Sequence, residues 1–245
     1  MSIDCRKDAP IGVFDSGVGG LTVVREIMQN LPNENLVYFG DTARVPYGSK
    51  SVDTIIRFSK QIVRFLKTKK VKAIVIACNT VSALALDILR EETDVPVIGV
   101  VKPGSKVAAE VTDNNRVGII GTEATVKSGV YTKFIQQYQP NIQVLAKACP
   151  LFVPLVEEGF VDNRIAREAI DYYLHEMKQS GIDTLILGCT HYPLLYNPIK
   201  SYMGEKIRLV NPAYETALEL KQLLKENNLE NILQETGKVP AYEFY

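Results

Sequence analysis

Short apolar runs rich in β-branched residues alternate along the chain with stretches of helical periodicity. The apolar runs predict strands over residues 11–14, 36–39, 73–77, 97–101, 116–120, 142–146, 184–187 and 207–210. Apolar residues between them recur at helical spacing and predict helices over residues 21–29, 55–66, 81–89 and 164–179. Near-continuous apolar strands that alternate with helices are typical of a mostly parallel sheet covered on both faces. The pattern therefore predicts an α/β fold.

Two pairs of segments resemble each other. Residues 117–122 resemble residues 11–16, and residues 184–191 resemble residues 73–80. The two pairs have nearly the same separation along the chain. This pattern predicts two similar α/β halves, each with a strand that ends in a cysteine.

Composition and charge narrow the class of protein. The chain has 245 residues, enough for one large domain or two small ones. Lys plus Arg and Asp plus Glu both number 28, so we do not expect a broad basic surface for nucleic acid. The longest apolar tract, residues 73–89, contains several polar residues and cannot span a membrane, and the N-terminus shows no signal peptide. We expect a cytoplasmic protein with no membrane partner.

The four cysteines form no CxxC pair, which argues against a zinc ribbon or a thioredoxin-type redox site. Ligands of open parallel sheets bind at the carboxyl ends of strands, so the residues after each strand are the candidates. These residues are Asp15-Ser16-Gly17, Gly40-Asp41, Cys78-Asn79-Thr80 and Cys189-Thr190-His191.

The glycine-rich segment 17–22 has two interpretations. It fails the G-x-G-x-x-G pattern at Thr22 and lacks a Walker lysine, so a nucleotide is not indicated. The segment is either a tight strand-to-helix turn or a small-anion site at a helix N-terminus.

Cys78 and Cys189 also have two interpretations. A cysteine after an apolar strand is often a small buried hydrophobic residue. Each cysteine, however, is expected at the start of a helix, where the dipole lowers the pKa of a thiol, and each precedes residues with hydrogen-bonding side chains. Two such thiols on opposite faces of one substrate could invert a tetrahedral carbon, because one removes a proton and the other returns it.

His191 could orient or deprotonate Cys189 or protonate a substrate, and the alternative is a partly buried histidine in a loop. Too few companion ligands surround these two residues in sequence for a zinc site, so no metal is expected. The pair Glu157-Glu158 could be no more than a solvated helix start.

Several motifs together resemble one family. Residues 11–23, 38–48, 77–80, 151–159 and 188–194 match, in order, the motifs of bacterial glutamate racemases, which interconvert L- and D-glutamate without a cofactor. The resemblance covers most of the chain from position 10 to about position 225. It implies two flavodoxin-like domains that face each other across the active site. We expect residues 1–100 with 214–245 in the first domain and residues 101–213 in the second.

The resemblance also implies roles for individual residues. Cys78 and Cys189 look like the acid/base thiols, with Asp15 as partner of Cys78 and with His191 and Glu157 as partners of Cys189. The positions that match the family's substrate contacts are Asp15, Ser16, Tyr47, Gly48, Asn79, Thr80, Thr190 and His191, with Thr122 as a further candidate. D-Glutamate feeds peptidoglycan synthesis in this family, and a homodimer is expected.

The C-terminal residues 239–245 predict a strand. Family members usually continue with a Ser-Gly-Asp segment and a helix that packs on the N-terminal domain, so we expect apolar surface left exposed here. Two alternatives to glutamate racemase stay open. One is a two-thiol racemase for aspartate or a hydantoin, and the other is an inactive glutamate-binding homologue.

Overall fold

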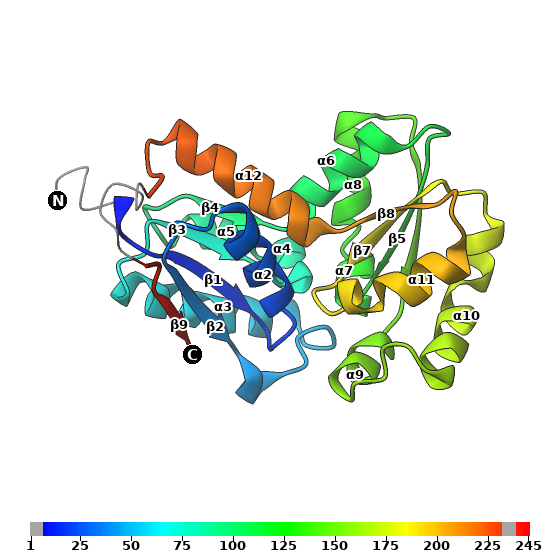
Figure 1. Ribbon diagram of the computed structural model, residues 1–245, viewed down its shortest axis with the longest axis horizontal. Helices are drawn as coiled ribbons and strands as arrows, with labels where there is room; N and C mark the ends of the chain where they lie inside the picture. The colour runs from blue at the N-terminus through cyan, green and yellow to red at the C-terminus, as the bar shows by residue number, and fades with distance from the viewer. Residues whose placement is uncertain (1–6, 232–238) are drawn as a thin grey trace. The chain divides into compact units, whose positions relative to one another are not determined.

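The computed structural model describes residues 7–231 and 239–245, and its contacts divide the chain into two compact units. Unit 1 contains the described residues of 1–100 and 213–245, and unit 2 is the continuous segment 101–212. Each unit is built around its own parallel sheet, as Figure 1 shows. The predicted α/β fold with two similar units is confirmed.

The sheet of unit 1 has five strands in the order β4-β3-β1-β2-β9, and all neighbouring pairs are parallel. The red strand β9 lies beside the blue strand β2 in Figure 1, although the two are far apart in sequence. The strands are β1 (Ile11–Asp15), β2 (Leu36–Gly40), β3 (Ala73–Ile76), β4 (Val97–Gly99) and β9 (Tyr242–Phe244). The strand predicted in the C-terminal segment is thus present.

Two apolar clusters cover the two faces of this sheet. Alternate residues of β1 divide between them: Ile11 and Val13 pack with α2 and α12, whereas Phe14 packs with α3, α4 and α5. Burial on both faces explains why the strands are continuously apolar. The helices are α2 (Leu21–Asn30), α3 (Val52–Thr68), α4 (Asn79–Leu84), α5 (Leu86–Arg90) and α12 (Pro212–Glu226), with a short 3-10 turn η1 (Thr42–Arg44).

The sheet of unit 2 has the order β6-β5-β7-β8, again with every pair parallel. Its strands are β5 (Arg116–Gly121), β6 (Gln143–Ala148), β7 (Thr184–Gly188) and β8 (Arg208–Val210). The order matches that of unit 1 strand by strand: β5 takes the place of β1, β6 that of β2, β7 that of β3 and β8 that of β4. This is the flavodoxin-like order, and it matches the two similar halves predicted from the repeated segments.

Helices cover both faces of the second sheet (Figure 1). One apolar cluster joins Leu185 and Leu187 of β7 to the helices α9, α10 and α11, while α6 contacts β7, β8 and α8. The helices are α6 (Val101–Val111), α7 (Glu123–Lys127), α8 (Val130–Tyr138), α9 (Phe152–Glu157), α10 (Arg164–Gln179) and α11 (Tyr196–Met203), with a 3-10 turn η2 (Tyr192–Leu195).

Two predicted elements need correction. The helix predicted over residues 81–89 is two helices, α4 and α5, because the backbone of Ala85 leaves helical geometry at φ −131°. The strand predicted over residues 97–101 ends at Gly99, and Val101 begins α6. Pro103 in the first turn of α6 suits a helix start, since its missing N–H is not needed there.

Candidate active site

Asp15, Ser16 and Cys78 meet at the carboxyl edge of the first sheet. Strands β1 and β3 are neighbours, with Phe14 opposite Ile76, so the residues that follow each strand come together. The Cys78 Sγ lies 3.5 Å from the Ser16 Oγ. We call these residues, with Asn79 and Thr80, the Cys78 cluster.

The glycine-rich turn after β1 wraps around the Asp15 carboxylate. This side chain is fully buried, and its Oδ2 accepts hydrogen bonds from the N–H groups of Gly20, at 2.8 Å, and Gly17, at 3.3 Å. A Cβ at Gly20 would lie 2.4 Å from the Asp15 Cβ, so only glycine allows this approach. The contacts support the tight-turn interpretation, because the protein's own carboxylate occupies these two N–H groups.

Burial, followed by the negative charge of Asp15, raises the pKa of the Cys78 thiol to about 12. Hydrogen bonds from Ser16 and from the N–H of Val81 in α4 act in the opposite direction but are smaller. Cys78 does lie at the N-cap of α4, as predicted, and the Val81 N–H of this helix lowers its pKa, but burial and the Asp15 charge outweigh that effect. The free thiol is therefore protonated over the neutral pH range.

Asn79 and Thr80 form the first turn of α4, directly after Cys78, and both are buried. Their place follows from the short connection between β3 and α4, which leaves no room for a loop. Every side chain in the predicted set 78–80 therefore lies at the same sheet edge as Asp15.

Tyr47 and Gly48 lie in the segment after β2, which contains a cis peptide bond between Val45 and Pro46. Tyr47 is buried, and its hydroxyl donates to the Asp41 carboxylate, which also accepts from the Arg44 Nε at 2.8 Å. In the sequence, Asp41 is a residue after a strand and part of the family motif 38–48, and neither feature predicts its contact with Tyr47. The available signal for this network was an acidic residue, Asp41, three positions before a basic one, Arg44.

Cys189 and Thr122 meet at the carboxyl edge of the second sheet. Strands β5 and β7 are neighbours with Gly121 opposite Gly188, so Thr122 and Cys189 each follow at the same level. Thr122 is the N-cap of α7, where its side chain accepts from the Thr125 N–H at 3.3 Å. The equivalent strands of unit 1 bring Ser16 and Cys78 together in the same way.

Cys189, His191 and Glu157 form a chain of contacts. The Cys189 Sγ lies 3.8 Å from the His191 Nδ1, and the His191 Nε2 lies 3.0 Å from the Glu157 Oε1. Cys189, Thr190 and His191 are buried, whereas the Glu157 side chain is 43% exposed. We call these residues, with Thr122, the Cys189 cluster. The alternative of a solvated helix start is wrong, because Glu157 is the last residue of α9 and its carboxylate contacts His191.

The expected helix start at Cys189 is wrong. Cys189 and Thr190 precede the short 3-10 turn η2, whose N-cap is His191, and the first α-helix after β7 is α11. Pro193 in this turn suits the tighter geometry. Cys189 thus has no α-helix N-terminus directly after it.

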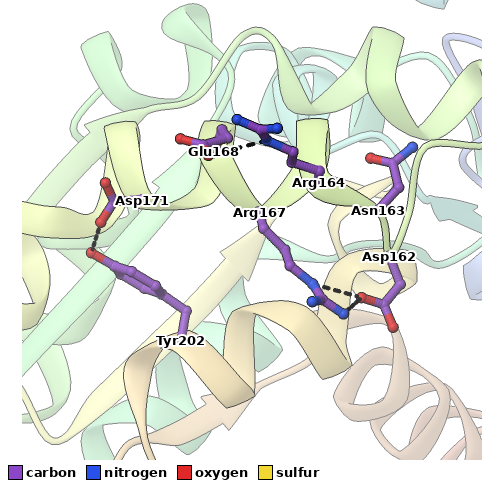
Figure 2. Close-up of a pocket in the computed structure, with 7 residues that line it drawn as sticks. All are labelled: Asp162, Asn163, Arg164, Arg167, Glu168, Asp171 and Tyr202. Atoms are coloured by element: carbon purple, nitrogen blue, oxygen red, sulfur yellow. Dashed lines mark hydrogen bonds and ion pairs between the residues drawn. The ribbon is translucent and has the colours of Figure 1, made fainter.

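A surface pocket of about 520 Å³ lies elsewhere in unit 2, around the start of α10 (Figure 2). Its arginines face acidic partners: Arg167 binds Asp162 at 2.9 Å, and Arg164 lies 3.8 Å from Glu168. Because each arginine is neutralised within the pocket, the lining offers little net charge to an anionic ligand. The pocket contains none of the predicted site residues.

The described part of the chain contains no group of three or more His, Cys, Asp or Glu side chains placed to hold a metal ion. Among the same residues, no helix combines the length and the hydrophobicity that a membrane crossing needs.

Comparison with known proteins identifies the family. Residues 11–219 match the model of the family described as Asp/Glu/Hydantoin racemase. A glutamate racemase of Geobacter metallireducens is 50% identical over 227 residues, which are 93% of this chain and 84% of the relative. The crystal structure of the Francisella tularensis glutamate racemase in complex with D-glutamate matches with a TM-score of 0.90 and 44% identity, over 98% of this chain and 88% of that one.

A glutamate racemase isoform of Bacillus anthracis matches with a TM-score of 0.91 and 36% identity, and the match covers 98% of both chains. The likeness extends through both α/β units. The chain therefore belongs to the Asp/Glu/hydantoin racemase family.

Proposed function

We propose that this protein is a glutamate racemase that uses Cys78 and Cys189 as its two acid/base groups. One observation carries the proposal: strands β3 and β7 occupy equivalent places in the two sheets, and a buried cysteine follows each of them. The identity to glutamate racemases across most of the chain supports glutamate as the substrate.

In the proposed reaction, the thiolate of one cysteine takes the α-proton of glutamate and becomes a thiol. The electron pair of the broken C–H bond remains on the substrate as a carbanion conjugated with the α-carboxylate. The thiol of the other cysteine then gives its proton to the opposite face and becomes a thiolate. The reverse reaction exchanges the two roles, so the mechanism requires that both thiols reach the same carbon atom.

The environments of the two thiols suit this chemistry. The raised pKa of Cys78 keeps this thiol protonated and ready to donate, and a bound α-ammonium group would favour its thiolate. The contact of Cys189 with His191, which in turn contacts Glu157, provides a route for moving a proton near the second thiol. We assign partner roles to Asp15 on the first side and to His191 and Glu157 on the second.

We propose that polar groups of both clusters hold the substrate. They would supply the electrostatic stabilisation that an α-carbanion needs in the absence of pyridoxal phosphate, and no cofactor is part of the proposal. The substrate contacts would be Asp15, Ser16, Tyr47, Gly48, Asn79, Thr80, Thr122, Thr190 and His191.

We further propose that residues 1–100 with 214–245 and residues 101–213 form the two domains that supply these contacts. The protein would act in the cytoplasm as a homodimer and would supply D-glutamate for peptidoglycan.

The test follows the circular dichroism of L-glutamate after addition of the purified protein. We expect the signal to decay to zero with the parent protein and to persist with Cys78→Ala or Cys189→Ala. Cys149→Ala is the matched control, because Cys149 is a third buried cysteine outside the proposed mechanism, and it should retain activity.

Activity that survives either Cys78→Ala or Cys189→Ala would exclude the two-thiol mechanism. A folded parent protein that leaves L-glutamate unchanged but racemises aspartate would move the substrate assignment to aspartate. A folded protein that binds glutamate without turnover would instead favour the inactive homologue.

A further inference from the structure

Two buried tyrosine hydroxyls donate to backbone carbonyls at the edges of the two clusters. The Tyr38 hydroxyl donates to the Gly17 carbonyl at 2.5 Å. The single proton of the Tyr192 hydroxyl is shared between two carbonyl acceptors, Cys149 at 2.8 Å and Gly121 at 3.1 Å. Neither tyrosine is part of the proposed substrate contacts, and both are almost completely buried.

Tyr38 lies against the turn that carries Asp15. A Cβ at Gly20 would lie 2.8 Å from the Tyr38 hydroxyl and 2.4 Å from the Asp15 Cβ, so this phenol fills the inside of the turn. A Cβ at Gly40 would lie 2.7 Å from the Gly17 carbonyl oxygen, so the end of β2 packs closely against the turn. The Tyr38 hydroxyl therefore links strand β2 to the glycine-rich turn by a buried hydrogen bond.

Tyr192 holds the second cluster from a different element. It lies in η2, three residues after Cys189, and its N–H donates to the Cys189 carbonyl at 3.1 Å. Its hydroxyl reaches the end of β5 at Gly121, the residue before Thr122. One side chain thus ties the Cys189 loop to the strand end that presents Thr122.

We infer that Tyr38 and Tyr192 are positioning residues, which hold the Cys78 cluster and the Cys189 cluster, respectively, in reactive geometry. The inference rests on the proposed racemase function. Each hydroxyl acts through a backbone carbonyl, not on the substrate. Loss of either hydroxyl leaves a buried carbonyl with fewer donors and lets the adjacent turn move.

The ionisation state of both phenols supports a constant donor role. Burial, and in second place the negative charge of Asp15, raises the pKa of Tyr38 well above its ordinary value. Burial raises the pKa of Tyr192 in the same direction. Both hydroxyls therefore keep their protons, and their hydrogen bonds, throughout the pH range in which a racemase would work.

The test compares Tyr38→Phe and Tyr192→Phe with the control Tyr202→Phe. Like the other two tyrosines, Tyr202 donates its hydroxyl within the protein, to Asp171 at 2.6 Å. It lies in the pocket of Figure 2, outside both clusters. We expect kcat/KM to fall about tenfold in the first two variants and to be unchanged in the control. The fall must be equal from L- and D-glutamate, since the equilibrium constant between enantiomers is one.

The decisive readout is the primary isotope effect on kcat/KM with α-deuterated L-glutamate and, separately, α-deuterated D-glutamate. If Tyr38 positions the Cys78 cluster, proton transfer at Cys78 becomes more rate-limiting in Tyr38→Phe. The isotope effect should then rise in the direction in which Cys78 is the base and fall in the opposite direction. Tyr192→Phe should give the reverse pattern, because its slower step is at Cys189.

Isotope effects that shift alike in both directions, or that match those of Tyr202→Phe, would overturn the inference. If one Phe variant does not fold, the other still decides, because its two isotope effects must move in opposite directions for L- and D-glutamate. An inactive parent protein would overturn the proposed function instead. Peptide-resolved alkylation then still tests positioning, since Tyr38→Phe should change the alkylation rate of Cys78 but not that of Cys189.

Discussion

A buried thiol and a buried carboxylate share the carboxyl edge of the first sheet. Asp15 carries its negative charge within electrostatic reach of the Cys78 sulfur and so opposes formation of the thiolate. Two backbone N–H groups hold the carboxylate in place, which prevents it from turning away. Burial and, in second place, a carboxylate at the same sheet edge therefore raise the proton affinity of Cys78.

We predict that Asp15→Asn accelerates alkylation of Cys78 by iodoacetamide at mildly alkaline pH. Removal of the negative charge lowers the pKa of Cys78 below its value of about 12, and a larger thiolate fraction reacts faster. Mass spectrometry of the Cys78 peptide measures the rate across a pH series. In the parent, the rate should keep rising through the highest pH at which the protein stays folded.

Cys149 is the internal reference for that measurement, because burial raises its pKa to about 12 without Asp15. Its alkylation should not respond to the substitution. An unchanged Cys78 rate in Asp15→Asn would show that burial alone controls this thiol.

We predict that Glu157→Gln reduces kcat about tenfold, equivalent to ~1.4 kcal/mol of transition-state stabilisation. The carboxylate that contacts and orients His191 is replaced by a neutral amide, which orients the ring less strongly. The free energy of unfolding should change by less than about 1 kcal/mol, because the Glu157 side chain is 43% exposed. Steady-state kinetics and urea unfolding measure the two quantities, and a kcat equal to that of the parent would remove Glu157 from the mechanism.

At this scale, the sequence shows which residues follow strands but not what surrounds them. Cys78 and Cys189 could be selected because each follows an apolar run, and His191 because it lies two residues after Cys189. The assignment of Glu157 as a partner on the Cys189 side depended on the family resemblance. The net shift of the Cys78 pKa could not be predicted, because burial and the Asp15 charge depend on tertiary packing. The contact between Tyr38 and Gly17 could not be predicted for the same reason, because an aromatic residue is common in a buried strand.

At the scale of the elements, two helix N-caps differ in their expected roles. One is only structural, and the other is also a proposed substrate contact. Asn163 caps α10 by accepting from the Ala166 N–H at 2.9 Å, and Thr122 caps α7 by accepting from the Thr125 N–H at 3.3 Å. Both caps satisfy a backbone donor that has no partner inside the helix.

We predict that Asn163→Ala and Thr122→Ala each lower the free energy of unfolding by about 1 kcal/mol. Only Thr122→Ala should raise the KM for glutamate, because Thr122 is the cap proposed to contact substrate. Chemical unfolding and initial-rate kinetics on the same preparations check this. Thr122→Ser keeps a hydroxyl and should restore both properties, whereas equal KM values in both Ala variants would leave Thr122 a purely structural cap.

The strands were predictable because burial on both sheet faces gives them an apolar signature. The ends of strands and helices were less predictable. The apolar run at residues 97–101 continues from β4 into α6 without a change of hydrophobicity, and periodicity cannot separate a buried strand from a buried helix start. The break at Ala85 also lacks a sequence signal, since the apolar spacing runs through it.

On the scale of the whole molecule, a buried ion pair joins distant segments of unit 1. The Lys72 ammonium pairs with Glu34 and donates to the carbonyls of Lys7, at 2.6 Å, and Leu229, at 2.8 Å. Glu34 also accepts from the Asn231 N–H at 2.9 Å. Both charged side chains are almost completely buried, so this cluster fastens the segment after α12 to the start of the sheet.

We predict that Lys72→Met destabilises the protein by about 3–5 kcal/mol, because it leaves the Glu34 charge buried without its partner. The double variant Lys72→Met/Glu34→Gln should recover much of this loss. Lys60→Met is the control: its pair with Glu92 is partly exposed and should change stability by less than about 1 kcal/mol. Urea unfolding measures all three, and a double variant as unstable as the single one would contradict the ion-pair argument.

The repeated segments predicted the duplication, and the matching strand orders of the two sheets agree with it. The cluster around Lys72 could not be predicted, because its members are brought together only when the chain returns to unit 1. No local pattern marks a lysine whose partners lie at positions 7 and 34, near the N-terminus, and at position 229, near the C-terminus.

The return of the chain to unit 1 has a consequence for synthesis. Ala217, Leu220 and Leu224 of α12 belong to the same apolar cluster as Ile11 and Val13 of β1. The ribosome makes the whole of unit 2 between these two sets of residues. Unit 2 can therefore fold while unit 1 still lacks part of its core, which reverses the usual order in which the N-terminal domain is completed first. The first hundred residues must remain soluble through the translation of more than a hundred others, and their exposed apolar face is what a chaperone would bind during that interval.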